Sequence, residues 1–79
     1  MTSDDLPVLP RQPGCYLWHA PDDRVIYVGK AIDLRSRVRS YFGATSGAKA
    51  QLITRGAQRL EYIVTTNEVE ALVEWKRSL

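Results

Sequence analysis

Two short apolar runs near the start of the chain, at residues 14–19 and 24–29, are rich in the side chains that suit strands. Residues 20–23 between them, Ala-Pro-Asp-Asp, have the composition of a tight turn, because proline presets φ and aspartate tolerates turn geometry. Three prolines before residue 14 exclude a helix there and favour an extended lead-in. The pattern therefore predicts a β-hairpin preceded by an extended segment.

The register of this hairpin decides which side chains share a face. If the first and last residues of the turn close it, Tyr16 lies opposite Tyr27 and Trp18 lies opposite Val25. Alternation then puts an aliphatic set on the other face: Cys15, Leu17, Ile26 and Val28. We expect the aliphatic face to be the core, with its cysteine buried in it, and the single histidine, His19, to be exposed at the hairpin tip.

A helical pattern follows the hairpin. Asp33 suits the N-cap of a helix that runs to about residue 42, where Gly43 ends it. At roughly 100° per residue, Leu34, Val38 and Tyr41 form its apolar stripe.

Three arginines on this helix fall on different faces. Arg35 and Arg39 are four residues apart and share one face. Arg37 lies between Leu34 and Tyr41 on the apolar side, so we expect it to be more buried than either neighbouring arginine. With Lys30 these side chains make a local basic stripe, which indicates either a phosphate-binding surface or an ordinary solvated helix face.

The rest of the chain predicts two more helices and one strand. A short helix is expected over residues 48–56, with these residues turned inward: Ala48, Leu52, and Gly56 or Ile53. Residues 59–65 suit a third strand, and Asn67 followed by Glu70 forms an approximate capping box for a last helix. Its expected buried stripe comprises Val69, Leu72, Val73 and Leu79.

The predicted order is β-β-α-α-β-α, which favours an α+β fold with a small three-stranded, mainly antiparallel sheet flanked by helices. Residues 1–13 form the extended, proline-containing lead-in, and residues 14–79 form a single domain. Because the chain stops inside the last predicted helix, we expect it to be an excerpt from a longer protein.

Composition narrows the class of protein. The 79 residues, 44% hydrophobic and 25% charged, suit one small folded domain. No apolar run approaches the roughly 18–20 residues of a membrane span, and no signal-peptide pattern occurs, so we expect a cytoplasmic protein with no membrane partner. The single cysteine cannot form an internal disulfide, and no Cys/His cluster offers a zinc site. A net charge of +2 does not by itself indicate nucleic acid.

Candidate chemistry is confined to phenols and cations beside a carboxylate-rich final helix. No glycine-rich nucleotide-binding motif occurs in the sequence. What remains is a set of five residues: Tyr16, Tyr27, Lys30, Arg37 and Tyr41. By pattern alone, tyrosines on strands more often pack than react.

Two short motifs resemble the paired signature of the GIY-YIG nuclease family. They are Gly14-Cys15-Tyr16 and, ten residues later, Tyr27-Val28-Gly29-Lys30-Ala31, with cysteine and valine in place of the two isoleucines. The ordered match continues through the basic helix, the third strand and the start of the last helix. Within the family the chain is similar to the UvrC-type nucleases of bacterial excision repair, because Leu9-Pro10 and Pro13-Gly14 lie close to its start.

The resemblance implies a metal-dependent endonuclease that hydrolyses a phosphodiester bond of double-stranded DNA during nucleotide excision repair. It implies a structure-directed incision on the 3′ side of a lesion, with UvrB and UvrA as partner proteins. Arg35 and Arg39 would bind the DNA backbone. One divalent cation, Mg²⁺ or Mn²⁺, would be the cofactor.

The resemblance also assigns roles to the five candidate residues. Tyr27 would be the general base for the attacking water, or a relay to a metal-bound one. Arg37 would hold the scissile phosphate and stabilise its developing charge. Tyr16, Lys30 and Tyr41 would position phosphate or water and tune Tyr27.

The metal ligand is where this chain departs from the family. The family's last helix resembles Glu-Ala-Leu-x-Leu-Glu, whereas here Glu74 comes one position early and Trp75 occupies the aligned ligand position. Mg²⁺ prefers oxygen ligands, which an indole cannot supply. Glu74 is the expected ligand and Glu70, four residues before it on the same helix face, is the alternative.

Three other functions stay open at this point. The chain could be a catalytically idle DNA-binding module of the same fold, and metal-dependent nicking would separate the two. It could be a stand-alone or mobile-element nuclease, which the sequence after Leu79 would decide. A purely protein-binding domain would show no salt-sensitive affinity for DNA.

Overall fold

The computed structural model describes residues 1–77, and for residues 68, 69, 71, 72 and 74 it describes the backbone alone. The elements follow the predicted order, β-β-α-α-β-α, after a short 3-10 turn, η1 (Ser3–Asp5). They are β1 (Gly14–His19), β2 (Val25–Ala31), α1 (Leu34–Arg39), the 3-10 turn η2 (Ser40–Phe42), α2 (Gly47–Gly56), β3 (Arg59–Val64) and α3 (Glu68–Arg77).

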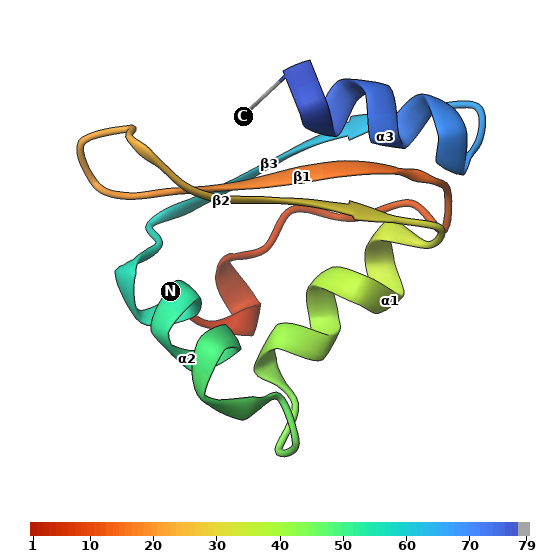
Figure 1. Ribbon diagram of the computed structural model, residues 1–79. Helices are drawn as coiled ribbons and strands as arrows, with labels where there is room; N and C mark the ends of the chain where they lie inside the picture. Colours follow the sequence, from red (N-terminus) through yellow and green to blue (C-terminus); the bar gives the residue numbers. More distant parts are fainter. Residues whose placement is uncertain (78–79) are drawn as a thin grey trace.

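The strands form one antiparallel sheet in the order β2-β1-β3, which makes β1 central and leaves β2 and β3 at the edges. Helix α3 covers one face of this sheet, and α1, α2 and the lead-in lie on the other (Figure 1). The predicted α+β fold with a small antiparallel sheet is confirmed. None of the helices in residues 1–77 has the length and apolar character needed to cross a membrane.

The hairpin loop is one residue longer than the sequence suggested. The backbone N–H of Ala20 donates to the oxygen of Arg24 at 2.8 Å, so Arg24 closes the loop and not Asp23. Asp23 has a φ of 68°, the left-handed conformation that ends a three-residue hairpin loop. The register also shifts between Trp18 and His19, where Ile26 is the extra residue of a bulge.

The expected register is therefore wrong. Tyr16 lies opposite Gly29, not Tyr27, and Trp18 lies opposite Tyr27, not Val25. Directly opposed residues share a face of an antiparallel pair. The aromatic side chains of β1 therefore lie on the same face as Tyr27 and Gly29.

That aromatic face, and not the aliphatic one, holds the larger core, which corrects the second expectation about the hairpin. Trp18, Leu34 and Val38 are fully buried in it, together with Tyr16, which is 2% exposed. Two helices and the lead-in cover this face, whereas only α3 covers the other (Figure 1). The aliphatic residues make a smaller cluster, in which Cys15 is buried as predicted: Cys15, Leu17 and Val28, with Trp75 packed against them.

Helix α1 begins where the sequence indicated. The side chain of Asp33 accepts a hydrogen bond from the backbone N–H of Ser36 at 3.1 Å, the arrangement of an N-cap. The backbone N–H groups of the first two helical residues donate to carbonyl oxygens of the lead-in. That of Leu34 donates to Gln12 at 3.0 Å and that of Arg35 to Pro10 at 3.2 Å. The lead-in thus satisfies donors that the first turn of a helix leaves unpaired. The helix tightens into η2 and ends at Gly43, with its predicted stripe facing the core.

The inward faces of the other two helices were only partly predicted. In α2, Ile53 is buried, whereas Ala48, Leu52 and Gly56 are exposed. In α3, Val73 is 45% exposed and does not belong to a buried stripe. Three other members of the predicted stripe lie outside the described residues: Val69 and Leu72 in their side chains, and Leu79 entirely. The expected cap is present, since the N–H of Glu70 donates to Asn67 Oδ1 at 2.8 Å.

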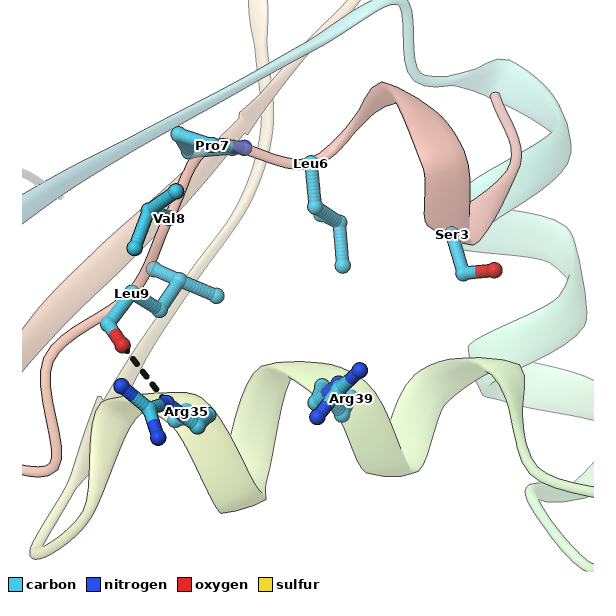
Figure 2. A pocket seen from close by; sticks show the side chains of 7 residues that line it. All are labelled: Ser3, Leu6, Pro7, Val8, Leu9, Arg35 and Arg39. Atoms are coloured by element: carbon cyan, nitrogen blue, oxygen red, sulfur yellow. Dashed lines mark hydrogen bonds between the residues drawn. The ribbon is translucent and has the colours of Figure 1, made fainter.

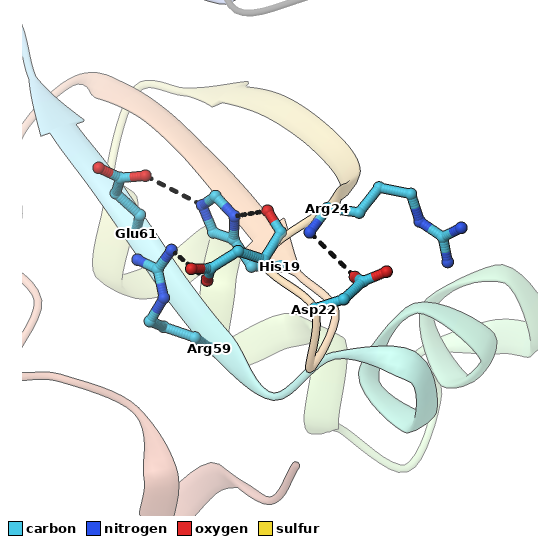
Figure 3. A network of polar contacts seen from close by, with 6 residues as sticks. His19, Asp22, Arg24, Arg59 and Glu61 are labelled. Atoms are coloured by element: carbon cyan, nitrogen blue, oxygen red, sulfur yellow. Dashed lines mark hydrogen bonds and ion pairs between the residues drawn. The ribbon is translucent and has the colours of Figure 1, made fainter.

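His19 is buried, which contradicts the expectation of an exposed turn residue. Its side chain is 8% exposed, and its Nε2 lies 2.9 Å from Glu61 Oε1 (Figure 3). Its Nδ1 lies 3.1 Å from the backbone oxygen of Asp23, whose carboxylate pairs with Arg59 at 3.0 Å. The longer loop curls back toward β3, so this histidine joins the hairpin to the neighbouring strand.

Candidate active site on the tyrosine face

A shallow hollow on the α1–α2 side of the sheet, here called the tyrosine pocket, brings together residues from four segments. Three sequence-predicted residues line it: Tyr27 from β2, Arg37 from α1 and Tyr41 from η2. The rest of the lining comprises Ser40, Ser46, Lys49, Ala50 and Ile53. These eight residues include two cations and no carboxylate, so the pocket suits an anion.

Tyr16 lies beneath the pocket and reaches it through Tyr41. Their hydroxyl oxygens are 2.9 Å apart, and their rings meet edge to face with centroids 5.7 Å apart. Burial, with the hydrogen bond to Tyr41, raises the pKa of the Tyr16 phenol far above its ordinary value. Burial also raises the pKa of Tyr41. Both phenols therefore stay protonated at neutral pH and serve as hydrogen-bonding groups. Tyr27 is the third phenol and lines the pocket beside Tyr41.

The two glycines of the paired motifs are explained by close approaches. A Cβ atom on Gly29 would lie 2.3 Å from both the hydroxyl oxygen and Cζ of Tyr16. A Cβ on Gly14 would lie 2.2 Å from the backbone oxygen of Ile63. The first glycine makes room for the Tyr16 ring, and the second lets β3 pair closely with β1.

Lys49 is a pocket residue that sequence reasoning missed. Its Nζ lies over the ring of Tyr27, 4.8 Å from the centroid, a cation–π distance. The signal was present but ambiguous, because Lys49 stands four residues before Ile53 and so shares its side of α2. Choosing Ala48 and Leu52 as the inward residues turned the helix to the wrong phase.

Arg37 is exposed, so the expectation that it is more buried than its neighbours is wrong. It lines the tyrosine pocket and is exposed to solvent. Arg35 is the more buried residue, because its Nε donates to the backbone oxygen of Leu9 at 2.8 Å. Arg37 nonetheless lines the tyrosine pocket together with Tyr27 and Tyr41.

Arg35 and Arg39 line a different hollow, between α1 and the lead-in (Figure 2). Its other lining residues are mainly apolar: Ser3, Leu6, Pro7, Val8 and Leu9. Arg35 and Arg39 therefore share one face of α1 and Arg37 lies on another, as predicted, although the face of Arg37 is not the buried one. The lead-in lies across the face of the helix that carries Arg35 and Arg39, which the sequence pattern did not indicate.

The structure does not place Lys30 in the tyrosine pocket. Lys30 is exposed and lies opposite Cys15 in the β1–β2 register, on the face of the sheet that α3 covers. Because β2 is an edge strand, a side chain from this face can reach the tyrosine pocket only around the edge of β2.

The carboxylates predicted to bind a metal come from α3, on that same face. The side chain of Glu74 lies outside the described residues. Glu70 is exposed, and its carboxylate accepts a hydrogen bond from the Thr66 hydroxyl. Within the described side chains, no three His, Cys, Asp or Glu residues converge as metal ligands would. Mg²⁺ is usually held by one or two carboxylates together with water and substrate phosphate, so a single glutamate of α3 suffices for such a site.

Comparison with known proteins identifies related domains. Residues 12–77 match the model of the UvrC-like GIY-YIG domain. The chain is similar to the GIY-YIG N-terminal endonuclease domain of UvrC from Thermotoga maritima, in a structure bound to its catalytic divalent cation, magnesium. The two share 35% identity with a TM-score of 0.82, and the match covers 90% of this chain and 78% of that one. Two point mutants of that domain, each with a tyrosine replaced by phenylalanine and each bound to the cation, match with 34% identity. Both cover 90% of this chain and 77% or 78% of theirs, with TM-scores of 0.81 and 0.82.

Proposed function

Since the chain belongs to the family of UvrC-like GIY-YIG domains, we propose that it is an endonuclease domain whose tyrosine pocket hydrolyses a phosphodiester bond of double-stranded DNA. The observation that carries this proposal is the pairing of a phenol, Tyr27, with a guanidinium, Arg37, in one solvent-open hollow that no carboxylate lines. A DNA phosphate meets complementary charge there, next to a group able to take a proton from water.

The pocket residues divide the work of hydrolysis. Tyr27 first loses its hydroxyl proton to solvent, or passes that proton on in a relay, and so accepts the proton of the attacking water. Arg37 binds the scissile phosphate and stabilises the charge that develops on it. Tyr41 and the buried Tyr16 beneath it stay neutral and orient water or phosphate through their hydroxyls. Lys30 contributes positive charge from the edge of β2 and does not contact the pocket itself.

A divalent cation, Mg²⁺ or Mn²⁺, completes the proposed site and would supply Lewis acidity toward the phosphate and the leaving oxygen. Glu74 is the proposed ligand and Glu70 the alternative. The T. maritima domain binds magnesium as its catalytic cation, which supports the proposal. A carboxylate from α3 would have to reach around the edge of β2, because α3 and the tyrosine pocket lie on opposite faces of the sheet.

The likeness to UvrC extends the proposal to biology. We infer an incision on the 3′ side of a lesion in nucleotide excision repair, in the bacterial cytoplasm and with UvrB and UvrA as partners. The support is the similarity to a UvrC domain over most of both chains. A stand-alone nuclease of the same family would instead cut DNA without those partners.

A nicking assay tests the activity. The full-length protein, with UvrA, UvrB and lesion-containing duplex, should nick the damaged strand in Mg²⁺ or Mn²⁺ and should not do so in EDTA. Arg37→Ala should lower nicking while leaving the fold intact, since the side chain is exposed. Salt-sensitive DNA binding without nicking under any of these conditions would favour the idle DNA-binding module. The sequence argument for that module is that Trp75 occupies the position where the family has its metal-binding glutamate.

A further inference from the structure

We propose that Lys49 binds the DNA phosphate from α2, across the tyrosine pocket from Arg37, and so supplies the second cation of the site. The inference rests on the proposed function and adds to it a phosphate-contacting residue on another helix. The two cations stand on separate elements, α1 and α2, and line the same hollow, to which β2 contributes Tyr27.

The surroundings of Lys49 leave its ammonium available to an anion. No carboxylate lines the tyrosine pocket, and in the described part of the chain no ion pair involves Lys49. Its described contact is with the ring face of Tyr27, at 4.8 Å from the centroid. An exposed cation–π contact is worth only about 0.5–1 kcal/mol, so an approaching phosphate can draw the ammonium away from the ring.

A second cation would stabilise negative charge that develops during the reaction. A phosphodiester carries one negative charge, and attack by hydroxide adds another in the transition state. Arg37 presents a planar fork that can bind two phosphate oxygens, whereas a lysine presents a compact charge. Because its ammonium lies next to the Tyr27 ring, Lys49 would meet the phosphate beside the phenol that activates water. The hydroxyl of Ser46 adds a neutral donor to the same pocket, whereas that of Ser40 donates to the backbone oxygen of Arg37.

A different role for Lys49 must be separated from this one. The lysine could merely brace the Tyr27 ring, in which case its loss would disturb the phenol without removing a DNA contact. The salt dependence of DNA binding distinguishes the two, because each phosphate contact that is lost lowers the slope of log K against log salt by about one unit. Bracing alone leaves that slope unchanged.

The test compares Lys49→Gln with two matched variants in the full-length protein. Lys49→Arg keeps the charge, and Arg55→Gln removes an exposed cation of the same helix that lies outside the tyrosine pocket. A fluorescent duplex reports binding over a range of salt, and single-turnover nicking reports the rate. We expect Lys49→Gln to lower the salt slope by about one unit and the nicking rate roughly 10- to 100-fold. Lys49→Arg should keep the wild-type slope, and Arg55→Gln should change neither quantity.

The outcomes separate this proposal from the proposed function. If the wild-type protein never nicks DNA but Lys49→Gln still lowers the salt slope, the nuclease proposal fails and the phosphate contact stands. A wild-type slope in Lys49→Gln overturns the contact, whether the rate falls, which would indicate bracing, or does not. An equal loss of slope in Arg55→Gln also overturns it, because the effect would then belong to the charge of the helix and not to the pocket.

Discussion

Replacing Gly29 with alanine should damage the site without touching any reactive group. Gly29 lies opposite Tyr16 in the β1–β2 register, and the Tyr16 ring occupies the space that a side chain at Gly29 would need. The new methyl group would lie 2.3 Å from Cζ and from the hydroxyl oxygen, where ordinary contacts begin at 3.4 Å. The ring must therefore retreat by about 1 Å, which breaks its 2.9 Å hydrogen bond with Tyr41.

The size of the effect follows from two contributions. Overpacking of this kind typically destabilises a protein by about 1–3 kcal/mol, and the lost hydrogen bond adds about 1 kcal/mol. We expect Gly29→Ala to lower the free energy of unfolding by roughly 2–4 kcal/mol, a large share of the roughly 4–12 kcal/mol typical of a domain this size.

Urea unfolding of the domain measures this loss, and two comparisons assign it to the ring. In a Tyr16→Leu background the atoms that clash are absent, so Gly29→Ala should then change the free energy of unfolding by less than about 0.5 kcal/mol. Gly43→Ala is the control, because Gly43 has an ordinary φ of −72° and 3.6 Å of space to its nearest neighbour. An equal loss with and without the Tyr16 ring, or a loss below about 0.5 kcal/mol in the wild type, would refute the reasoning.

Three further predictions concern the phenols, the arginines and the metal. The free energy of unfolding should fall as pH rises above about 10, because Tyr16 loses its proton in the unfolded chain but keeps it when it is buried in the folded one. Urea unfolding at several pH values measures this fall, and Tyr16→Phe should make it shallower by at most about 1.4 kcal/mol per pH unit. Arg37→Ala should lower the rate of single-turnover nicking by about 10²-fold with little change in DNA affinity, whereas Arg39→Ala should mainly lower the salt slope of DNA binding by about one unit. Equal effects of the two variants would contradict the division of α1 into two faces. Mn²⁺ soaked into crystals should give density beside Glu74 within reach of the tyrosine pocket; density at Glu70 would move the ligand, and no density at either would refute the single-metal site.

Local chemistry explains why much of the fold could be predicted. The bounds of β1 agree because its flanking signals are short-range, a glycine after proline at one end and a proline turn at the other. Helix α1 agrees because the Asp33 cap and the Leu34–Val38 stripe are both read within one or two turns. The three phenols meet because their elements were placed correctly, even where the pairing between them was not.

The predictions that failed concern features that the local sequence allows in more than one form, and most of these features are decided by contacts between distant segments. The hairpin register turned on the left-handed conformation of Asp23, which the composition of the turn permits but does not require. Which sheet face became the main core depended on two helices and the lead-in settling on the aromatic side. The burial of Arg35 and the exposure of Arg37 follow from the same lead-in, which lies across one face of α1. In α2, two helical phases fitted the apolar residues, so Lys49 was overlooked.

The central claim is that the tyrosine pocket is the catalytic site, and Tyr27→Phe tests it most directly. The change removes one hydroxyl from a half-buried ring and should leave the urea unfolding curve unchanged. The account predicts that single-turnover nicking by the full-length protein, with its partners and Mg²⁺ present, falls about 10²-fold or more, the scale of general-base effects. Nicking within about twofold of the wild-type rate would contradict it, because the phenol would then take no part in the reaction.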